Sequence, residues 1–338
     1  MGDLIHLMPA LSDASQYNPE VQFTWVVDEA FAEIPLWHPS VKGVIKSAHR
    51  RWKKDWTHFF KSGQAKAFSQ ELRAQTYDYV IDAQASLKSA LVTRLAKGPR
   101  HGMDKLSVRE NFAQSAYQYR YYVPKQMHAI SRLRLLFSKV FKYDLVAGPA
   151  NFQLTLPEQD ASVHDDKPYL VCVRNASWPT KLWQDYHWQA LFALTENTYS
   201  IKLPTGNDEE FETASRLAQT FGHVEALPRM SLNKTAHLIK NATGVVSTDT
   251  GLGHIAAALG IPCVSLYGPT DTALIGAIGQ NQEHLYTGDL ECRPCYRKSC
   301  NYFNDARVSA HCMDTLAPEE VWQLLDRLIS NIKTSTVN

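Results

Sequence analysis

The stretch GVVSTDTGLGHIAAALGIPCVSLYG, residues 244–268, decides the fold. A short apolar run ends in a glycine-rich turn, a helical segment follows and stops at Gly260, and a second apolar run begins at 262. Strand, turn, helix and strand in so few residues are typical of a parallel, doubly wound sheet. The turn before the helix places free backbone N–H groups where such sheets bind anionic ligands.

Strand and helix alternate in the same way through the rest of the second half, and with longer connections through the first. In the second half we expect strands at 168–174, 200–206 and 223–228, helices from Gln184, Glu209 and Ser231, and a last amphipathic helix over 318–332. In the first half we expect strands at 23–28 and 77–83 and helices over 2–14, 86–96 and 128–141. Pro, Gly and charged residues between 148 and 166 mark a boundary, so the expected domains are 1–155 and 156–338.

Composition excludes several classes of protein. The 338 residues include 35 Lys and Arg against 34 Asp and Glu, a formal net charge of +1, which argues against a globally basic nucleic-acid binder. The start, MGDLIHLMPAL, lacks the basic residues of a secretory signal. The longest apolar stretch, 244–268, is interrupted by Asp249 and His254 and is no membrane-spanning helix. We therefore expect a cytoplasmic protein whose contact with a membrane is peripheral.

The turn after the apolar run 244–248 is a candidate anion-binding site. Asp249, Thr250 and Gly251 lead into the helix there, and a glycine lets a phosphate approach the N–H groups at the helix start. The turn lacks the Gly-Lys-Ser/Thr of a Walker loop. An ordinary capped turn, with Asp249 or Thr250 as the cap, explains the same residues, so the sequence leaves both interpretations open.

Two charged residues near other helix starts are further candidates. Lys181 follows the strand at 168–174 and can neutralise a diphosphate, with Ser177 adding a hydroxyl, whereas a surface lysine beside a Trp-Pro loop is the structural alternative. Asp3 begins the first helix. It is either a helix N-cap or a general base that takes a proton from an attacking hydroxyl.

A basic stretch with interleaved tryptophans lies in the first half. It is either a solvated face or a docking patch for a polyanion: nucleic acid, acidic lipid headgroups or an acidic sugar. The neutral net charge favours acidic lipid or sugar over duplex nucleic acid. The members of the stretch are Lys42, Lys46, Arg50, Arg51, Trp52, Lys53, Lys54 and Trp56.

Four of the six cysteines follow the spacing C-x2-C-x4-C-x11-C. One interpretation is a tetrahedral structural zinc site; the other is free or redox-labile thiols, because the second half is not a C-x2-C pair. A disulfide is disfavoured in the cytoplasm. Cys172 and Cys263 fall within expected strands, so we expect them to be buried and unreactive. The clustered four are Cys292, Cys295, Cys300 and Cys312.

Together these segments resemble the lipopolysaccharide heptosyltransferase family, and within it the type I enzymes. The resemblance extends along almost the whole chain and is most specific in WVVDEAFAEIP (25–35) and HRRWKK (49–54), while DTGLGH (249–254) and YGPTD (267–271) are shared more widely. It implies a GT-B fold, two Rossmann-like doubly wound domains facing across a cleft, and it allows the last helix to cross back to the first domain. It also implies an inverting transfer of L-glycero-D-manno-heptose from ADP-heptose to the Kdo of Kdo-lipid A, with no metal cofactor required for catalysis.

The resemblance assigns roles to individual residues. Asp3 matches the family's catalytic base, and Lys181 matches the lysine that contacts the donor diphosphate. The basic loop that meets the acidic acceptor, in the N-terminal domain, matches Arg50, Arg51, Lys53 and Lys54. The matches that bind the donor in the C-terminal domain are Glu210 at the ribose, Met230 at the adenine, and Asp249, Thr250, Gly251 and His254 of the DTG-x-x-H motif.

The chain departs from the family pattern at three points. The family begins with a strand before Met-Gly-Asp, so the first strand of the N-terminal domain is expected to be absent here. Ala176 stands where a hydroxyl residue is usual, and the cysteine-rich insertion is more typical of other members. Alternatives are therefore a transferase that adds a later core heptose, a non-catalytic nucleotide-binding homologue, or an RNA- or membrane-binding protein. We expect a monomer that meets ADP-heptose, Kdo-lipid A and the periphery of the inner membrane, and no nucleic acid.

Overall fold

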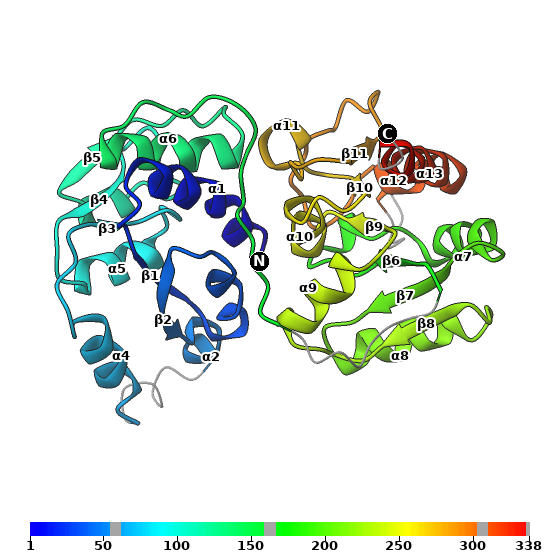
Figure 1. Ribbon diagram of the computed structural model, residues 1–338, viewed down its shortest axis with the longest axis horizontal. Helices are drawn as coiled ribbons and strands as arrows, with labels where there is room; N and C mark the ends of the chain where they lie inside the picture. Colours follow the sequence, from blue (N-terminus) through cyan, green and yellow to red (C-terminus); the bar gives the residue numbers. More distant parts are fainter. Residues whose placement is uncertain (55–61, 159–166, 303–309, 336–338) are drawn as a thin grey trace. The chain divides into compact units, whose positions relative to one another are not determined.

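The computed structural model describes residues 1–54, 62–158, 167–302 and 310–335. The chain divides into two compact units (Figure 1). The N-terminal unit is His6–Thr155, and the C-terminal unit joins Leu156–Asn338 to the first five residues, Met1–Ile5. Helices and parallel strands alternate in both, which confirms the expected α/β class.

The C-terminal unit is built on a six-stranded parallel sheet in the order β11-β10-β9-β6-β7-β8. The chain runs from β6 to the edge strand β8 and returns to β9 on the other side of β6, so the winding direction switches between β6 and β9. Ligands of doubly wound sheets bind at this switch point. Five strands confirm the expected pattern: β6 (Tyr169–Val173), β7 (Ser200–Pro204), β8 (Val224–Leu227), β9 (Gly244–Thr248) and β10 (Cys263–Tyr267). The strand β11 (Gln282–Tyr286) was not predicted.

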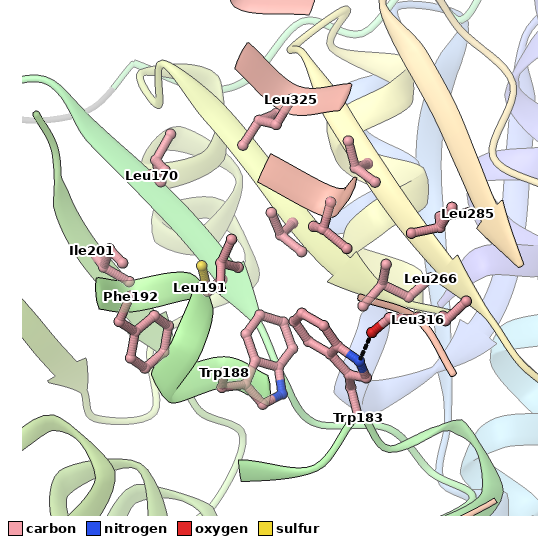
Figure 2. Packing of buried hydrophobic residues seen from close by; sticks show 14 of the residues in the cluster. Leu170, Trp183, Trp188, Leu191, Phe192, Ile201, Leu266, Leu285, Leu316 and Leu325 are labelled. Atoms are coloured by element: carbon pink, nitrogen blue, oxygen red, sulfur yellow. Dashed lines mark hydrogen bonds between the residues drawn. The ribbon is translucent and has the colours of Figure 1, made fainter. Parts of the chain in front are cut away.

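Helices pack on this sheet around a large apolar cluster (Figure 2). Trp188 and Phe192 of α7 and Leu325 of α13 belong to it, and the indole N–H of Trp183 donates to the carbonyl oxygen of Leu316 at 3.1 Å. Helices α9 and α10 pack against each other outside this cluster. The helices of this unit are α7 (Asp185–Thr195), α8 (Asp208–Ala218), α9 (Leu232–Lys240), α10 (Gly251–Ala258), α11 (Thr272–Ile275), α12 (His311–Asp314) and α13 (Pro318–Ser335), with the 3₁₀ turn η4 (Pro179–Lys181).

In the N-terminal unit the described strands form two parallel sheets. Val26 of β1 and Val80 of β3 pack against the same apolar cluster, although no pairing joins these two strands in the described part of the chain. One sheet pairs β1 (Phe23–Asp28) with β2 (Val41–Ser47); the other has the order β3 (Val80–Ile81), β4 (Arg100–Met103), β5 (Tyr119–Tyr121).

Helix α1 (Gly2–Tyr17) begins at the expected Gly-Asp start and extends three residues beyond the expected stretch 2–14. Its buried Asp13 pairs with Arg134 of α6, Oδ2 to Nε 2.6 Å, which ties the two helices together inside the N-terminal unit. No helix within the described ranges is both long and apolar enough to cross a membrane. The other helices of the unit are η1 (Glu29–Phe31), η2 (Ile34–Trp37), α2 (His49–Lys54), α4 (Gln64–Leu72), α5 (Leu87–Leu95), η3 (Ala113–Ala116) and α6 (Ala129–Phe141).

Candidate functional site

The candidate site lies at the carboxyl ends of three neighbouring strands, β6, β9 and β10 (Figure 1). Lys181 follows β6, Asp249 follows β9 and Thr270 follows β10. Parallel strands end at the same edge of a sheet, so residues distant in sequence meet there. Thr248, the last residue of β9, donates its hydroxyl to the carbonyl oxygen of Val173 at the end of β6, at 3.2 Å, which holds two of these ends together.

Lys181 and Asp249, both predicted from the sequence, form an ion pair. Nζ of Lys181 lies 2.6 Å from Oδ2 of Asp249, and the two side chains are only 12% and 5% exposed. The ammonium also lies 4.8 Å from the centre of the Trp178 ring, whose face attracts cations. An ammonium fixed in this way can stabilise negative charge that develops on a leaving diphosphate.

Thr270 is a site residue that we did not predict individually. Its hydroxyl donates to the same Oδ2 of Asp249 at 2.6 Å. Burial and then the negative charge of Asp249 raise the pKa of Tyr267, which precedes this turn in β10. The sequence signal was the polar turn directly after the strand at 262–268, at the edge where ligands bind.

Helix α10 begins directly after Asp249 and Thr250. Thr250 occupies the N-cap position, and within the described residues its side chain makes no capping hydrogen bond. The carboxylate of Asp249 is engaged by Lys181 and Thr270, whereas Thr250 occupies the N-cap position that the capped-turn alternative allowed, so both interpretations of this turn remain. A Cβ on Gly253 would lie 2.9 Å from Oγ of Ser247, so this glycine allows the helix to begin close to β9. The first N–H groups of a helix have no intrahelical partners and suit a phosphate.

Asp3 lies in the first turn of α1 and is exposed; it is part of the helix, so the N-cap alternative is wrong. Its neighbour Gly2 is packed against α10: a Cβ there would meet Cδ2 of the buried His254 at 3.0 Å. A Cβ on Gly251 would likewise meet Cβ of Met1 at 2.4 Å. The first turn of α1 therefore lies beside the DTG-x-x-H segment, and an exposed carboxylate there can accept a proton.

The residues predicted for the ribose and the adenine lie at the same end of the sheet. The Glu210 carboxylate accepts hydrogen bonds from Nδ2 of Asn175, directly after β6, at 2.9 Å and from N of Gly206, after β7, at 2.8 Å. Met230 is half-buried in the segment between β8 and α9, and Ser177 is exposed between β6 and η4.

The basic stretch lies on two elements of the N-terminal unit: Lys42 and Lys46 belong to β2, and Arg50 to Lys54 belong to the short helix α2, while Trp56 lies outside the described residues. Arg51 donates to the carboxylate of Glu29 at 3.1 Å and to Oε1 of Gln64 at 2.9 Å, and the Glu29 hydrogen bond raises the pKa of the guanidinium. Of the four predicted acceptor-binding cations, Arg51 is therefore already paired with an acid of the same unit. The other three, Arg50, Lys53 and Lys54, are in α2, with side chains outside the described part of the chain.

The clustered cysteines are not arranged as a metal site in the described residues, where no group of three or more His, Cys, Asp and Glu side chains is placed to hold an ion. Cys312 is buried, and burial raises the pKa of its thiol to about 11. Cys300 is half-buried and packs against the same apolar cluster. Cys172 and Cys263 are fully buried, as predicted.

The cysteine-rich segment supports the site loops, a role that the sequence did not reveal. Nε of Arg293 donates to the carbonyl oxygen of Gly268 at 2.6 Å, and Nη2 donates to that of Thr270 at 3.3 Å. The hydroxyl of Thr180, beside Lys181, donates to the carbonyl oxygen of Arg297 at 2.6 Å. The segment thus holds the turns that follow β6 and β10.

Residues 65–304 match the model of Glycosyltransferase family 9 (heptosyltransferase). The chain is 40% identical over 340 residues to lipopolysaccharide heptosyltransferase 1 of Pseudomonas aeruginosa, a match that covers 97% of this chain and 95% of the relative. It is 44% identical over 284 residues to lipopolysaccharide heptosyltransferase 1 of Escherichia coli K12, covering 83% and 89% of the two chains.

Solved structures agree with these sequence matches. The E. coli heptosyltransferase WaaC with ADP superimposes with a TM-score of 0.83 at 38% identity, over 97% of both chains. The same enzyme with ADP-2-deoxy-2-fluoro heptose gives 0.80 at 36% identity, over 97% and 96%. The chain belongs to glycosyltransferase family 9, the heptosyltransferases.

Proposed function

We propose that the protein is an inverting glycosyltransferase that moves L-glycero-D-manno-heptose from ADP-heptose to the Kdo of Kdo-lipid A, in synthesis of the lipopolysaccharide inner core. The observation that carries this proposal is the Lys181–Asp249 pair beside the start of α10, in a chain 40% identical to a lipopolysaccharide heptosyltransferase 1. An ammonium and backbone N–H groups at the switch point of a doubly wound sheet suit a sugar diphosphate.

Each part of the donor has a partner at this edge of the sheet. Lys181, the N–H groups after Thr250 and the Ser177 hydroxyl hold the diphosphate, Glu210 accepts hydrogen bonds from the ribose hydroxyls, and Met230 packs on the adenine. The relatives support this assignment, because E. coli WaaC was solved with ADP and with a fluorinated ADP-heptose.

The reaction is a single displacement at the anomeric carbon of the heptose. The exposed carboxylate of Asp3 takes the proton of an acceptor hydroxyl, whose oxygen forms the new bond to that carbon. The bond from the anomeric carbon to the diphosphate oxygen breaks, and the electron pair leaves with ADP. Lys181 and the start of α10 stabilise the negative charge on the departing diphosphate.

The acceptor is anionic and is anchored in a membrane. The cations of α2, Arg50, Arg51, Lys53 and Lys54, bind the Kdo carboxylate and the lipid A phosphates, for which guanidinium groups have matching geometry. The protein accordingly acts as a monomer in the cytoplasm, at the periphery of the inner membrane. A duplex nucleic acid is not a partner, since the net charge is only +1.

Catalysis needs no metal in this proposal, because Lys181 supplies the positive charge at the diphosphate. The four clustered cysteines are free thiols in this proposal, since no group of three or more His, Cys, Asp and Glu in the described residues is placed to hold an ion; a structural zinc, which their spacing allows, is the alternative. Transfer rates with and without EDTA test the first statement. Zinc analysis of the purified protein and of Cys312→Ser tests the second: a zinc content near one per chain that the variant loses assigns the metal.

The decisive test is transfer of heptose from ADP-heptose to Kdo-lipid A, with Asp3→Asn as the diagnostic variant. The variant keeps the shape of the side chain and loses the base, so transfer should fall by about 100-fold or more while ADP binding is retained. The matched control is Asp208→Asn, which removes an exposed acid from the first turn of α8. Unchanged turnover in Asp3→Asn would show that Asp3 is not the catalytic base. If the parent binds ADP but transfers no heptose to Kdo-lipid A, the later-heptose transferase or the non-catalytic homologue is favoured instead.

A further inference from the structure

The N-terminal unit exposes an unusual group of large apolar side chains. Leu87 and Leu91 lie one turn apart on α5 and are 51% and 58% exposed. Leu106 and Phe112 are 69% and 79% exposed, the two highest values among the large hydrophobic side chains of the described residues. Isolated exposed leucines are common on proteins, whereas several in one region mark a binding surface.

Backbone hydrogen bonds hold the two segments that carry these side chains together. The N–H of Leu87 donates to the carboxylate of Glu110 at 2.8 Å. The N–H groups of Arg109 and Glu110 both donate to the carbonyl oxygen of Ala85 at 3.2 Å. Helix α5 also contacts η3, which begins directly after Phe112. The four apolar side chains therefore belong to one region of the N-terminal unit.

The charges of this region are mainly positive. Lys88 and Arg94 on α5 and Lys105 and Arg109 in the second segment are all exposed. The exposed acid among them, Glu110, is engaged by the backbone N–H of Leu87. Apolar side chains surrounded by lysine and arginine are typical of surfaces that lie on anionic lipid headgroups.

The region is close to the helix proposed to meet the acceptor. Burial and then the positive charge of Lys88 lower the pKa of His49, the first residue of α2, while Asp28 raises it. Lys88 therefore lies within electrostatic reach of α2. A surface that rests on a bilayer at this place would bring α2 near the headgroups of a lipid-anchored sugar.

We propose that Leu87, Leu91, Leu106 and Phe112, with Lys88 and Arg109, form a docking surface for a bilayer containing anionic phospholipid. The inference rests on the proposed function, in which the acceptor is a membrane lipid, and adds the part of the chain that meets the membrane. The apolar side chains enter the headgroup region, and the cations attract the anionic lipids.

Sedimentation of the full chain with lipid vesicles tests this surface without any assay of transfer. The parent should bind phosphatidylcholine vesicles that contain phosphatidylglycerol, and should bind phosphatidylcholine alone much more weakly. Leu91→Ser combined with Phe112→Ser should weaken binding about tenfold or more, because two large apolar groups are lost. Lys88→Gln and Arg109→Gln should each weaken it about fivefold at low salt. The matched control is Leu36→Ser combined with Leu145→Ser, two exposed leucines elsewhere in the same unit, with binding unchanged.

A second measurement separates this proposal from the proposed function. Transfer to a water-soluble Kdo acceptor without acyl chains should be equal in the parent and in Leu91→Ser/Phe112→Ser, and transfer to an acceptor embedded in anionic vesicles should fall in the variant. Absence of soluble transfer in the parent contradicts the proposed function and leaves the vesicle result standing. Equal vesicle binding by parent and variant overturns the docking surface. Self-association of the parent that the variant loses also overturns it, and assigns the surface to a second copy of the chain.

Discussion

The Lys181 ammonium and the Asp249 carboxylate lie 2.6 Å apart at the ends of β6 and β9, with side chains only 12% and 5% exposed. A buried ion pair adds little net stability, because the cost of desolvation offsets most of the attraction. Replacing one member of the pair by a neutral residue lowers the free energy of unfolding, since the remaining buried charge has no partner. The main role of the pair is therefore to fix the position of the Lys181 ammonium at the strand ends.

Lys181→Met should separate the chemical role of the ammonium from its structural role. We expect kcat to fall by about 100- to 1,000-fold, as for loss of one preorganised group that stabilises a leaving charge. The free energy of unfolding should fall by about 3 kcal/mol, because Asp249 is left buried and uncompensated. Adding Asp249→Asn should restore stability in urea denaturation and leave kcat low. A kcat close to that of the parent would refute the role of the ammonium.

Thr270→Val tests the second partner of Asp249. The substitution keeps the shape of the side chain and removes the 2.6 Å hydrogen bond, so we expect a loss of about 1–2 kcal/mol in the free energy of unfolding. The fall in kcat should be smaller than in Lys181→Met, because the ammonium remains. The control is Thr334→Val on α13, an exposed hydroxyl bonded to its own helix, where we expect a change within about 0.5 kcal/mol. Equal effects of the two substitutions would contradict this account.

The sequence was most informative where local pattern determines structure. Strands β9 and β10 follow from short apolar runs bounded by turn residues, and Lys181 and Asp249 follow from their positions just after strands. Thr270 and Arg293 act through contacts between turns that are far apart in the chain. Those contacts depend on strand order, which a single sequence does not fix.

The N-terminal unit shows why other elements escaped prediction. Buried and exposed side chains do alternate along strand β2, with Val41 and Ile45 buried and Lys42 and Lys46 exposed. The same lysines also fit a basic patch, so the sequence pattern did not single out a strand. Helix α2 has six residues, too few for a helical period to be recognised. Among its described side chains, Trp52 is buried against the apolar cluster.

Asp13→Asn should destabilise the N-terminal unit. Its carboxylate pairs with Arg134 across α1 and α6, with side chains 4% and 10% exposed, so the substitution leaves a buried guanidinium without its counter-charge. We expect a loss of about 3 kcal/mol in urea denaturation. The control is Glu283→Gln, which breaks the exposed pair with Arg327 and should change stability by about 0.5 kcal/mol or less. Losses of equal size would show that burial does not set the cost.

His38 should make the N-terminal unit sensitive to mild acid. The side chain is fully buried, and burial lowers its pKa from 6.5 to about 4. The backbone N–H of Ser40 donates to Nδ1, which requires an unprotonated nitrogen there, and Nε2 lies 3.0 Å from Oγ of Ser12. The folded state therefore holds the neutral ring, whereas the unfolded chain takes up a proton below pH 6.5.

Stability from this group should be fully present above pH 6.5 and be lost as the pH falls from 6.5 towards 4. A pKa lowered from 6.5 to about 4 corresponds to a total of about 3 kcal/mol. Urea denaturation at several pH values should show this slope in the parent and a shallower one in His38→Gln, which has no charge to acquire. The matched control is His237→Gln, which makes the same substitution at a half-buried position in the C-terminal unit. A slope in His38→Gln as steep as that of the parent would assign the acid sensitivity to other groups.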